Sequence, residues 1–184
     1  MKKVLIGYGF SGIVQQAFER EGFFAVSCDL LPTESSTKHL RMDIHTAVYE
    51  DDWDLAIFFP PCTYLAVSGA RWWADRLEEQ EEALAEIRWL MSLDIPHIAI
   101  ENPIGKISTA IRKPDQIIQP WQFGHGEVKA TCFWLKGLPL LVPTDIVSGR
   151  HPRVFLEGPS PERSKNRSRT LNGVASAMAK QWGT

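Results

Sequence analysis

Short apolar runs, each bounded by Gly, Pro, Asp or Asn, recur along the first two-thirds of the chain. They have the length of strands, and their apolar residues follow one another with little alternation. This pattern predicts strands that are covered on both faces, as in a parallel sheet. The predicted strands cover residues 3–8, 23–29, 54–60 and 97–103.

Amphipathic patterns between these runs predict helices. One covers residues 11–21, and the clearest covers residues 73–93, where an apolar stripe lies opposite a glutamate-rich face. The stripe consists of Leu77, Ala83, Leu84, Ile87, Leu90 and Met91. The alternation of strands and helices predicts an α/β doubly wound fold, in which ligands bind beyond the carboxyl ends of the strands.

The last third of the chain has a different pattern. Residues 130–144 predict one or two antiparallel strands, residues 160–173 a basic, polar loop, and residues 174–182 a short helix. A chain of 184 residues with 44% hydrophobic residues suits a single domain with a sizeable core. We expect residues 1–120 to form the core of this domain and residues 121–184 to add a small extension and a C-terminal return segment.

Charge and cysteine content narrow the class of protein. The formal net charge of -2 argues against binding of long nucleic acids by charge alone. No apolar run approaches the ~20 residues of a membrane span. Cys28, Cys62 and Cys132 lie far apart without a Cys-x-x-Cys pair, so we expect a reducing, cytoplasmic setting. We expect no metal site, because His125 and Cys132 have no partners at ligand spacing.

The stretch "GYGFSG", residues 7–12, follows a predicted strand and precedes a predicted helix. It matches Gly-x-Gly-x-x-Gly, in which the glycines allow a tight turn and close approach of the backbone to a ligand. Asp29 ends the next strand and suits a ribose, and Asp43 follows at a spacing suited to an adenine edge. These residues predict a nucleoside-containing cofactor, either a dinucleotide or S-adenosylmethionine. The alternative is that the glycines serve only strand-to-helix packing.

Two motifs at strand ends carry candidate chemistry. "PPC", residues 60–62, places Cys62 just past one predicted strand, where a thiol is either buried or a nucleophile. "ENP", residues 101–103, ends the following strand. In apolar surroundings the pKa of Glu101 would be raised, so that it could protonate or hydrogen-bond a ring nitrogen. The alternative for Glu101 is a cap on the following segment, but the two motifs together favour the chemical interpretation.

Cations and aromatic residues elsewhere have two interpretations. The basic loop offers candidates for contact with a substrate phosphate, or is simply a solvated loop. Its cations are Arg163, Lys165, Arg167 and Arg169. Trp72, Trp73 and Trp121 are more often packing residues, with a stacking platform for bases as the alternative.

Taken together, "GYGFSG", "PPC", "ENP" and the terminal "RTLNGVASAMAKQWG" resemble the S-adenosylmethionine-dependent cytosine C5-methyltransferases. Through "IRKPDQIIQPWQFGHGEVKATCFWLKGLP" the chain is similar to small phage- and prophage-type proteins of that kind. The resemblance implies a Rossmann-like class I methyltransferase sheet. Only some 30 residues separate "WLKGLP" from the terminal motif, which implies a reduced or absent target-recognition domain.

The resemblance also implies roles for individual residues. Cys62 would add to C6 of a cytosine while Glu101 holds N3, with Asn102 and Lys129 as further contacts to the ring and its phosphate. S-adenosylmethionine would lie among residues of the glycine loop and the strand ends. Those residues are Tyr8, Gly9, Ser11, Gly12, Asp29, Asp43 and Pro60.

The sequence does not decide whether the substrate is a pyrimidine ring in DNA or in a free nucleotide. The resemblance favours cytosine in DNA, whereas the short chain and near-neutral charge favour a free pyrimidine nucleotide. A third hypothesis is a catalytically degenerate module that binds nucleotide. It arises because Phe10 stands where the family's first motif has a glycine.

Overall fold

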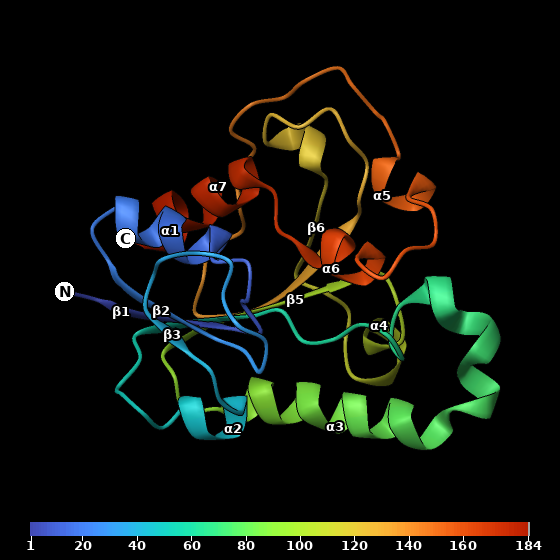
Figure 1. The fold of residues 1–184 in the computed structure, drawn as a ribbon, viewed down its shortest axis with the longest axis horizontal. Helices are drawn as coiled ribbons and strands as arrows, with labels where there is room; N and C mark the ends of the chain where they lie inside the picture. The colour runs from blue at the N-terminus through green and yellow to red at the C-terminus, as the bar shows by residue number, and fades with distance from the viewer. Residues whose placement is uncertain (184) are drawn as a thin grey trace.

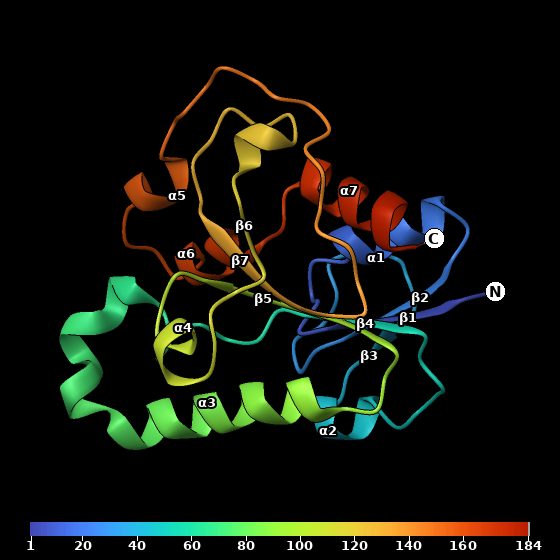
Figure 2. The ribbon, with the colours of Figure 1, turned by 180° about the vertical axis from the view of Figure 1, so that it is seen from behind.

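The computed structural model describes residues 1–183, which are organised around one mixed sheet (Figures 1 and 2). The strand order is β3-β2-β1-β4-β5-β7-β6. Strands β1 to β5 pair in parallel, and β7 is antiparallel to both β5 and β6. The strands are β1 (Lys3–Gly7), β2 (Phe24–Cys28), β3 (His39–Leu40), β4 (Leu55–Phe58), β5 (His97–Pro103), β6 (Gln116–Ile118) and β7 (Thr131–Lys136).

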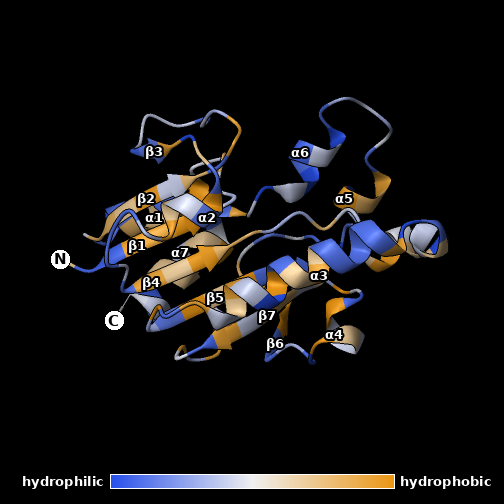
Figure 3. Cartoon of the chain, turned by 90° about the horizontal axis from the view of Figure 1, so that it is seen from below, coloured by the Kyte–Doolittle hydropathy of each residue, from blue (hydrophilic) through white to orange (hydrophobic). Residues whose placement is uncertain are grey.

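Helices cover both faces of the sheet, with α1 beside α7 on one face and α2 and α3 on the other (Figure 1). Figure 3 views the molecule from the side of α2 and α3. The α-helices are α1 (Ile13–Arg20), α2 (Ile44–Ala47), α3 (Leu77–Ser92), α4 (Ile107–Ala110), α5 (Arg153–Leu156), α6 (Arg163–Ser168) and α7 (Asn172–Trp182). Two 3-10 helices complete the set, η1 (Val67–Asp75) and η2 (Pro120–Gln122).

Neighbouring residues of the central strands enter two different cores, because successive side chains of a strand point to opposite faces. In β1, Leu5 packs with Ile87 and Leu90 of α3. Val4 and Ile6 pack on the other face with residues of α1 and α7. Because both faces of the central strands are buried, their sequences are continuous apolar runs and do not alternate between apolar and polar residues.

The predicted doubly wound α/β fold is confirmed, and the differences concern short or marginal elements. The helix predicted at 73–93 begins at Leu77, whose side chain is 67% exposed, and η1 precedes it. The loop predicted at 160–173 contains α6. The elements β3, β6, α2, α4 and α5 have two to four residues each. They are too short to produce a hydrophobic period.

The carboxyl ends of β1, β2, β4 and β5 meet at one edge of the sheet because these strands are parallel. In such folds this edge is where ligands bind. The glycine loop and both strand-end motifs are therefore brought to the same side of the molecule. Within residues 1–183, no helix has the length and apolar character needed to cross a membrane.

Candidate active site

A buried amide joins the two strand-end motifs. Asn102, near the end of β5, is 1% exposed, and its Nδ2 donates a 3.0 Å hydrogen bond to the carbonyl oxygen of Pro60. Its Oδ1 is buried without a partner among the described residues. A buried amide that loses such a bond leaves polar groups unpaired at a cost of about 1–3 kcal/mol. Asn102 thus fixes the position of "PPC" relative to "ENP".

The residues after Cys62 pack tightly against those after Glu101. The backbone N–H groups of Leu65 and Ala66 both donate to the Cys62 carbonyl oxygen, which forms a turn. Lys106 N–H donates to Leu65, and a Cβ atom on Gly105 would lie only 1.9 Å from the Leu65 oxygen. Only glycine allows the two backbones to approach this closely. The turn that carries Cys62 is therefore held by backbone contacts.

Cys62 is the exposed cysteine, whereas Cys28 and Cys132 are buried. The protein around the sulfur removes part of its hydration and raises the pKa of the thiol, and the nearby Glu101 carboxylate raises it further. The charges of Lys129 and Arg167 act in the opposite direction. Burial also raises the pKa of Glu101, against a smaller lowering by Lys129. The Glu101 carboxyl group and the Lys129 ammonium group therefore both shift the pKa of the Cys62 thiol at this edge of the sheet, and Lys129 also shifts the pKa of Glu101.

Glu101 and Lys129 line a small cavity with residues of β7, α7 and the segment before α7. Its volume of about 20 Å³ holds roughly one water molecule. Arg169, Thr170 and Leu171 form part of its wall. Lys129 Nζ donates a 2.8 Å hydrogen bond to the carbonyl oxygen of Arg167. The segment 167–171 thus closes the space in front of Glu101, and a pyrimidine ring needs that segment to move.

The glycines of "GYGFSG" have different roles. A Cβ on Gly7 would lie 2.4 Å from the Phe58 ring, so this glycine serves close packing of β1 against β4. Gly9 N–H donates to the Cys28 carbonyl oxygen at 3.0 Å, which turns the chain beside the end of β2. Gly12 has φ +70°, and a Cβ there would lie 2.2 Å from Ser35 Oγ. Ser35 therefore covers the loop at the start of α1.

The other predicted cofactor residues at this edge make local contacts. Asp29 Oδ1 accepts a 3.0 Å hydrogen bond from Leu31 N–H, and Asp43 Oδ1 accepts one of 2.7 Å from His45 N–H at the start of α2. Tyr8 adopts φ 59°, rare for a residue other than glycine, and its hydroxyl donates to Glu86. Burial raises the pKa of Tyr8. Ser11 Oγ lies 3.5 Å from the first N–H of α1.

These residues fit the nucleoside part of a cofactor on one side of the loop. Each of the two aspartates keeps a second carboxylate oxygen without a hydrogen bond among the described residues, and such oxygens are what ribose hydroxyls require. The side at Gly12 does not present a free backbone, because Ser35 lies against it. A cofactor that reaches Gly12 needs the segment around Ser35 to shift.

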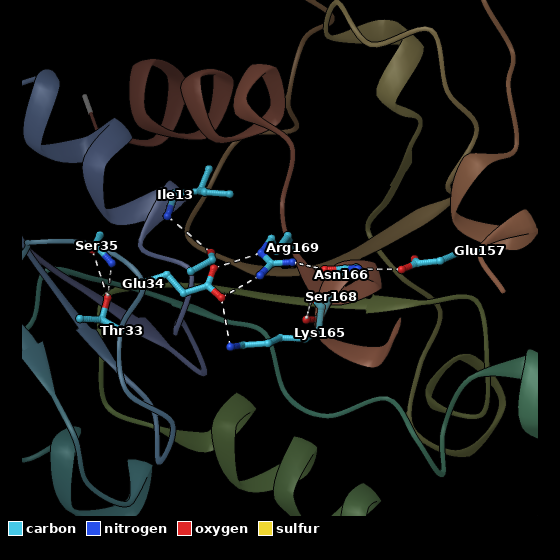
Figure 4. A network of polar contacts seen from close by, with 10 residues as sticks. Ile13, Thr33, Glu34, Ser35, Glu157, Lys165, Asn166, Ser168 and Arg169 are labelled. Atoms are coloured by element: carbon cyan, nitrogen blue, oxygen red, sulfur yellow. Dashed lines mark hydrogen bonds and ion pairs between the residues drawn. The ribbon is translucent and has the colours of Figure 1, made fainter. Parts of the chain in front are cut away.

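An ion-pair network connects that covering segment to the basic loop (Figure 4). Glu34 accepts hydrogen bonds from Arg169 Nη2 at 2.7 Å and Nε at 3.1 Å, and Lys165 Nζ lies 3.1 Å from its Oε1. These cations hold the pKa of Glu34 below its usual range, Arg169 more than Lys165. Arg169 and Lys165 also lie over the ring of Phe10, at 5.7 Å and 5.2 Å from the ring centre respectively.

Cys62, Glu101, Asn102 and Lys129 thus lie at the ends of β4 and β5 and before β7, and the glycine loop, Asp29 and Asp43 lie farther along the same edge. Among the cations proposed for phosphate, Arg169 and Lys165 face Glu34. Arg163 Nε is buried without a hydrogen bond among the described residues. Sequence reasoning missed Glu34, Ser35 and Gly105. Their roles depend on contacts with distant segments, and only the glycine carries a recognisable signal.

Comparison with known proteins identifies the fold. No family model matches the chain. No curated protein matches it in sequence either. Among solved structures, the chain is similar to an E. coli protein described as a DNA modification methyltransferase encoded within a prophage, with TM-score 0.55 and 13% identity. It is also similar to a variant of Spodoptera frugiperda DNMT2, with TM-score 0.51 and 17% identity.

The chain spans about half the length of these solved structures. The matches cover 80% and 83% of this chain, but only 52% and 55% of the two neighbours. At such low identity the likeness concerns the arrangement of the backbone. The strand order and the two structural neighbours together establish that this chain has an α/β Rossmann-like methyltransferase fold.

Proposed function

We propose that the protein transfers a methyl group from S-adenosylmethionine to C5 of a cytosine. The observation that carries the proposal is the joining of the two strand-end motifs by the Asn102–Pro60 hydrogen bond. It places an exposed thiol, Cys62, within the electrostatic influence of a carboxyl group, Glu101. A nucleophile and an acid at the carboxyl edge of a methyltransferase sheet suit attack on an electron-poor ring.

In the proposed reaction the Cys62 thiolate forms a bond to C6 of the pyrimidine. The electrons of the C5–C6 double bond shift into the ring as Glu101 gives its proton to N3, so that no full negative charge develops on the ring. When bound, S-adenosylmethionine supplies the methyl group to the activated C5 and leaves as S-adenosylhomocysteine. Transfer of the C5 proton to solvent water and rupture of the sulfur–C6 bond then restore the double bond and free Cys62, and the N3 proton returns to the Glu101 carboxylate.

The environment of both groups supports these roles. Burial raises the pKa of Glu101 and so favours its protonated form, the form that a proton donor requires. Lys129 lowers the pKa of the Cys62 thiol and so favours the thiolate. Burial of the thiol acts the other way, so a higher pH favours the Cys62 thiolate while a lower pH favours the protonated Glu101.

The cofactor would be held along the ends of β1 and β2. Asp29 is the candidate for the ribose hydroxyls, and the turn at Gly9 brings the backbone next to it. Asp43 and Tyr8 lie at the same edge, and Pro60 and Ser11 are further candidates for contact with the cofactor. The strand ends thus supply polar groups for the nucleoside.

We propose DNA as the substrate and not a free pyrimidine nucleotide. One of the structural neighbours is described as a DNA modification methyltransferase, and the sequence motifs resemble enzymes that act on DNA. Cys62 is exposed at the surface, so a strand can reach it. Such a strand must present its cytosine outside the helical stack.

Trapping of the covalent adduct tests the function. The protein is incubated with S-adenosylmethionine and DNA that contains 5-fluorocytosine, whose fluorine cannot leave as a proton does. The intact mass is expected to increase by the strand plus one methyl group, and Cys62→Ala is expected to abolish the increase. A parallel incubation with free 5-fluorodeoxycytidine monophosphate distinguishes the substrates. A full-size adduct in Cys62→Ala would contradict the mechanism.

A catalytically degenerate nucleotide-binding module is the second candidate. The observation that favours it is Ser35, which lies against Gly12 and covers part of the loop that would hold the cofactor. Titration calorimetry with S-adenosylhomocysteine distinguishes the two. Binding is expected for the methyltransferase, whereas binding of a nucleoside monophosphate without binding of S-adenosylhomocysteine would support the module.

A further inference from the structure

A second, larger cavity lies in the segment that follows Cys62. Its volume of about 310 Å³ is in the range of small-molecule sites. The cavity is independent of the closed space in front of Glu101, because the two share no lining residue. It is lined by Thr63, Tyr64, Gly69, Trp72, Trp73 and Arg76. Thr63 directly follows the proposed nucleophile, so a ligand in this cavity would be a neighbour of the target ring.

The aromatic walls of the cavity are paired with cations. Arg76 lies 5.6 Å from the centre of the Tyr64 ring, and Arg71 lies 4.9 Å from that of Trp72. Lys106 lies 5.5 Å from the ring centre of Trp73. The carboxylate closest to these cations in an ion pair is Glu79, at 3.9 Å from Arg76, which is a weak surface contact. Three cations therefore lie beside the aromatic rings of this segment, with the acidic residues Asp75 and Glu79 close by along the chain.

Part of this surface lacks a partner within the protein. Trp72 is 54% exposed, although a large aromatic side chain normally gains free energy from burial. The indole Nε1 of Trp73 is shielded from solvent, and it donates no hydrogen bond within the described residues. The exposed face of the Trp72 ring is a surface on which the ring of an aromatic ligand can stack.

The wall is held in place before any ligand arrives. Three of its residues, Gly69, Trp72 and Trp73, belong to η1, the green segment before α3 in Figure 1, and the others flank η1. Gln80 Nε2 donates a 2.9 Å hydrogen bond to the Tyr64 carbonyl oxygen, and Val67 N–H donates to Ile104. These contacts join the segment to α3 and to the residues after β5. A preformed site loses less conformational entropy on binding.

We propose that this cavity binds an unpaired nucleotide next to the target cytosine in a single strand of DNA. Aromatic faces stack on bases of any sequence, and cations beside them neutralise the phosphate. A paired base is stacked within its duplex and cannot enter. The inference rests on the proposed function for the position of the target. It adds that the substrate is a single-stranded or locally opened DNA strand and not a free nucleotide.

Fluorescence anisotropy tests the inference without catalysis. The protein carries Cys62→Ala, and the probe is a labelled eight-nucleotide strand with one central cytosine. Unlabelled strand, duplex of the same sequence and deoxycytidine monophosphate serve as competitors. The single strand is expected to compete best. Adding Trp72→Ala is expected to weaken strand binding about 5- to 100-fold, as the loss of one stacked base does, and to leave the mononucleotide unaffected.

Two further variants separate contact from folding. Trp121→Ala is the matched control, because Trp121 also carries an arginine over its ring, Arg150 at 3.9 Å, but lines neither cavity. Arg76→Gln is expected to reduce the slope of log affinity against log salt by about 0.7, the value for one phosphate contact to a single strand. A merely structural defect would leave that slope unchanged.

The outcomes of these experiments distinguish a failure of the inference from a failure of the proposed function. Equal effects of Trp72→Ala and Trp121→Ala, or duplex binding as tight as that of the single strand, would overturn the inference. Strand binding that depends on Trp72, in a protein that forms no adduct with 5-fluorocytosine, would keep the inference and reject the proposed function. Adduct formation by the protein, together with strand binding that does not depend on Trp72, would keep the proposed function and reject the inference.

Discussion

The two halves of the carboxyl edge of the sheet are held together in different ways. In the catalytic half, at the ends of β4 and β5, backbone contacts and the buried Asn102 fix the segments. In the glycine-loop half, at the ends of β1 and β2, one backbone hydrogen bond of 2.8 Å joins Glu34 N–H to the Phe10 carbonyl oxygen, and the other contacts of the cover are made by side chains. Ser35 lies against Gly12, and Glu34 is paired with Arg169 and Lys165.

This difference indicates which half can open. An exposed ion pair stabilises a protein by only about 0–1 kcal/mol, and a single hydrogen bond by about 0.5–1.5 kcal/mol. Displacing the cover breaks the pairs of Glu34 and its one backbone hydrogen bond to Phe10, and both losses are small. Separating backbones in close contact costs more. The segment 167–171 closes both halves, through Arg169 to Glu34 and through Arg167 to Lys129. Its movement would admit cofactor and target ring together, while Cys62 and Glu101 stay in position.

The largest expected effect concerns the acid of the catalytic half. Glu101→Gln keeps the shape of the side chain but removes the proton that is transferred to N3. We expect the rate of adduct formation with 5-fluorocytosine DNA to fall by about 100-fold or more, the usual contribution of a general acid. The measurement is the intact mass against time under single-turnover conditions.

The same variant contains its own control. The Glu101 carboxylate raises the pKa of the Cys62 thiol, so its removal favours the thiolate. Alkylation of Cys62 by iodoacetamide is therefore expected to proceed at least as fast as in the wild type. Parallel losses of adduct formation and of alkylation would show that Glu101 positions the thiol and does not supply a proton.

The second effect concerns the close contact in the catalytic half. In Gly105→Ala the new Cβ would lie 1.9 Å from the Leu65 oxygen, and backbone must move to admit it. We expect the free energy of unfolding to fall by about 1–3 kcal/mol in urea titration. Gly158→Ala is the matched control, because a Cβ there has no neighbour within 4 Å. Equal stability of the two variants would mean that the backbones separate easily.

The contrast between the halves also explains what the sequence could predict of the fold. The central strands β1, β2, β4 and β5 are covered on both faces, and their continuous apolar runs are visible without a structure. The helix at 73–93 was predicted four residues too long at its start. The Trp and Arg residues before Leu77 fit a helical period but form η1.

The catalytic half of the site could be predicted from the sequence, whereas the cover of the glycine-loop half could not. Cys62 and Glu101 end buried strands, so the topology alone brings them to one edge. The partner of Arg169 lies 135 residues away, in a loop without a hydrophobic pattern. No local rule connects Glu34 to that arginine. For the same reason the pairing of Lys165 and Arg169 with Glu34 could not be predicted, although their charge could.

The third effect is a change in the pH at which the Cys62 thiol becomes reactive. Lys129 lowers the pKa of both Cys62 and Glu101. In Lys129→Met both pKa values are expected to rise, so alkylation of Cys62 should reach its midpoint at higher pH. The rate is measured by mass spectrometry, where Cys28 and Cys132 are buried and react slowly.

Lys136→Met is the control for this displacement. Lys136 lies at the other end of β7 and also donates a 2.8 Å hydrogen bond to a backbone carbonyl, that of Leu93. It therefore loses an equivalent tether without a change of charge near the thiol. An equal displacement in both variants would mean that Lys129 acts through the structure of its segment and not through its charge.

The smallest effect tests the cover of the glycine-loop half. Glu34→Gln removes the charge that holds Arg169 and Lys165, and opening becomes easier. We expect S-adenosylhomocysteine to bind up to about fivefold tighter in calorimetry, since an exposed pair contributes at most about 1 kcal/mol. Glu81→Gln, which breaks the exposed pair with Arg88 on α3, is the control and should leave the affinity unchanged. Weaker binding in Glu34→Gln would mean that Glu34 contacts the ligand.

The pH dependence of this pair has a definite sign. Arg169 and Lys165 hold the pKa of Glu34 below its usual range, so the stabilisation is complete above the ordinary carboxyl pKa and is lost as pH falls through the lowered one. Wild type and Glu34→Gln should therefore differ in affinity at neutral pH and low salt. The difference should shrink on acidification and on addition of salt, which screens exposed charges. A difference that persists in high salt would attribute the cover to the contact of Ser35 with Gly12, and the two halves of the edge would then both be held by close packing.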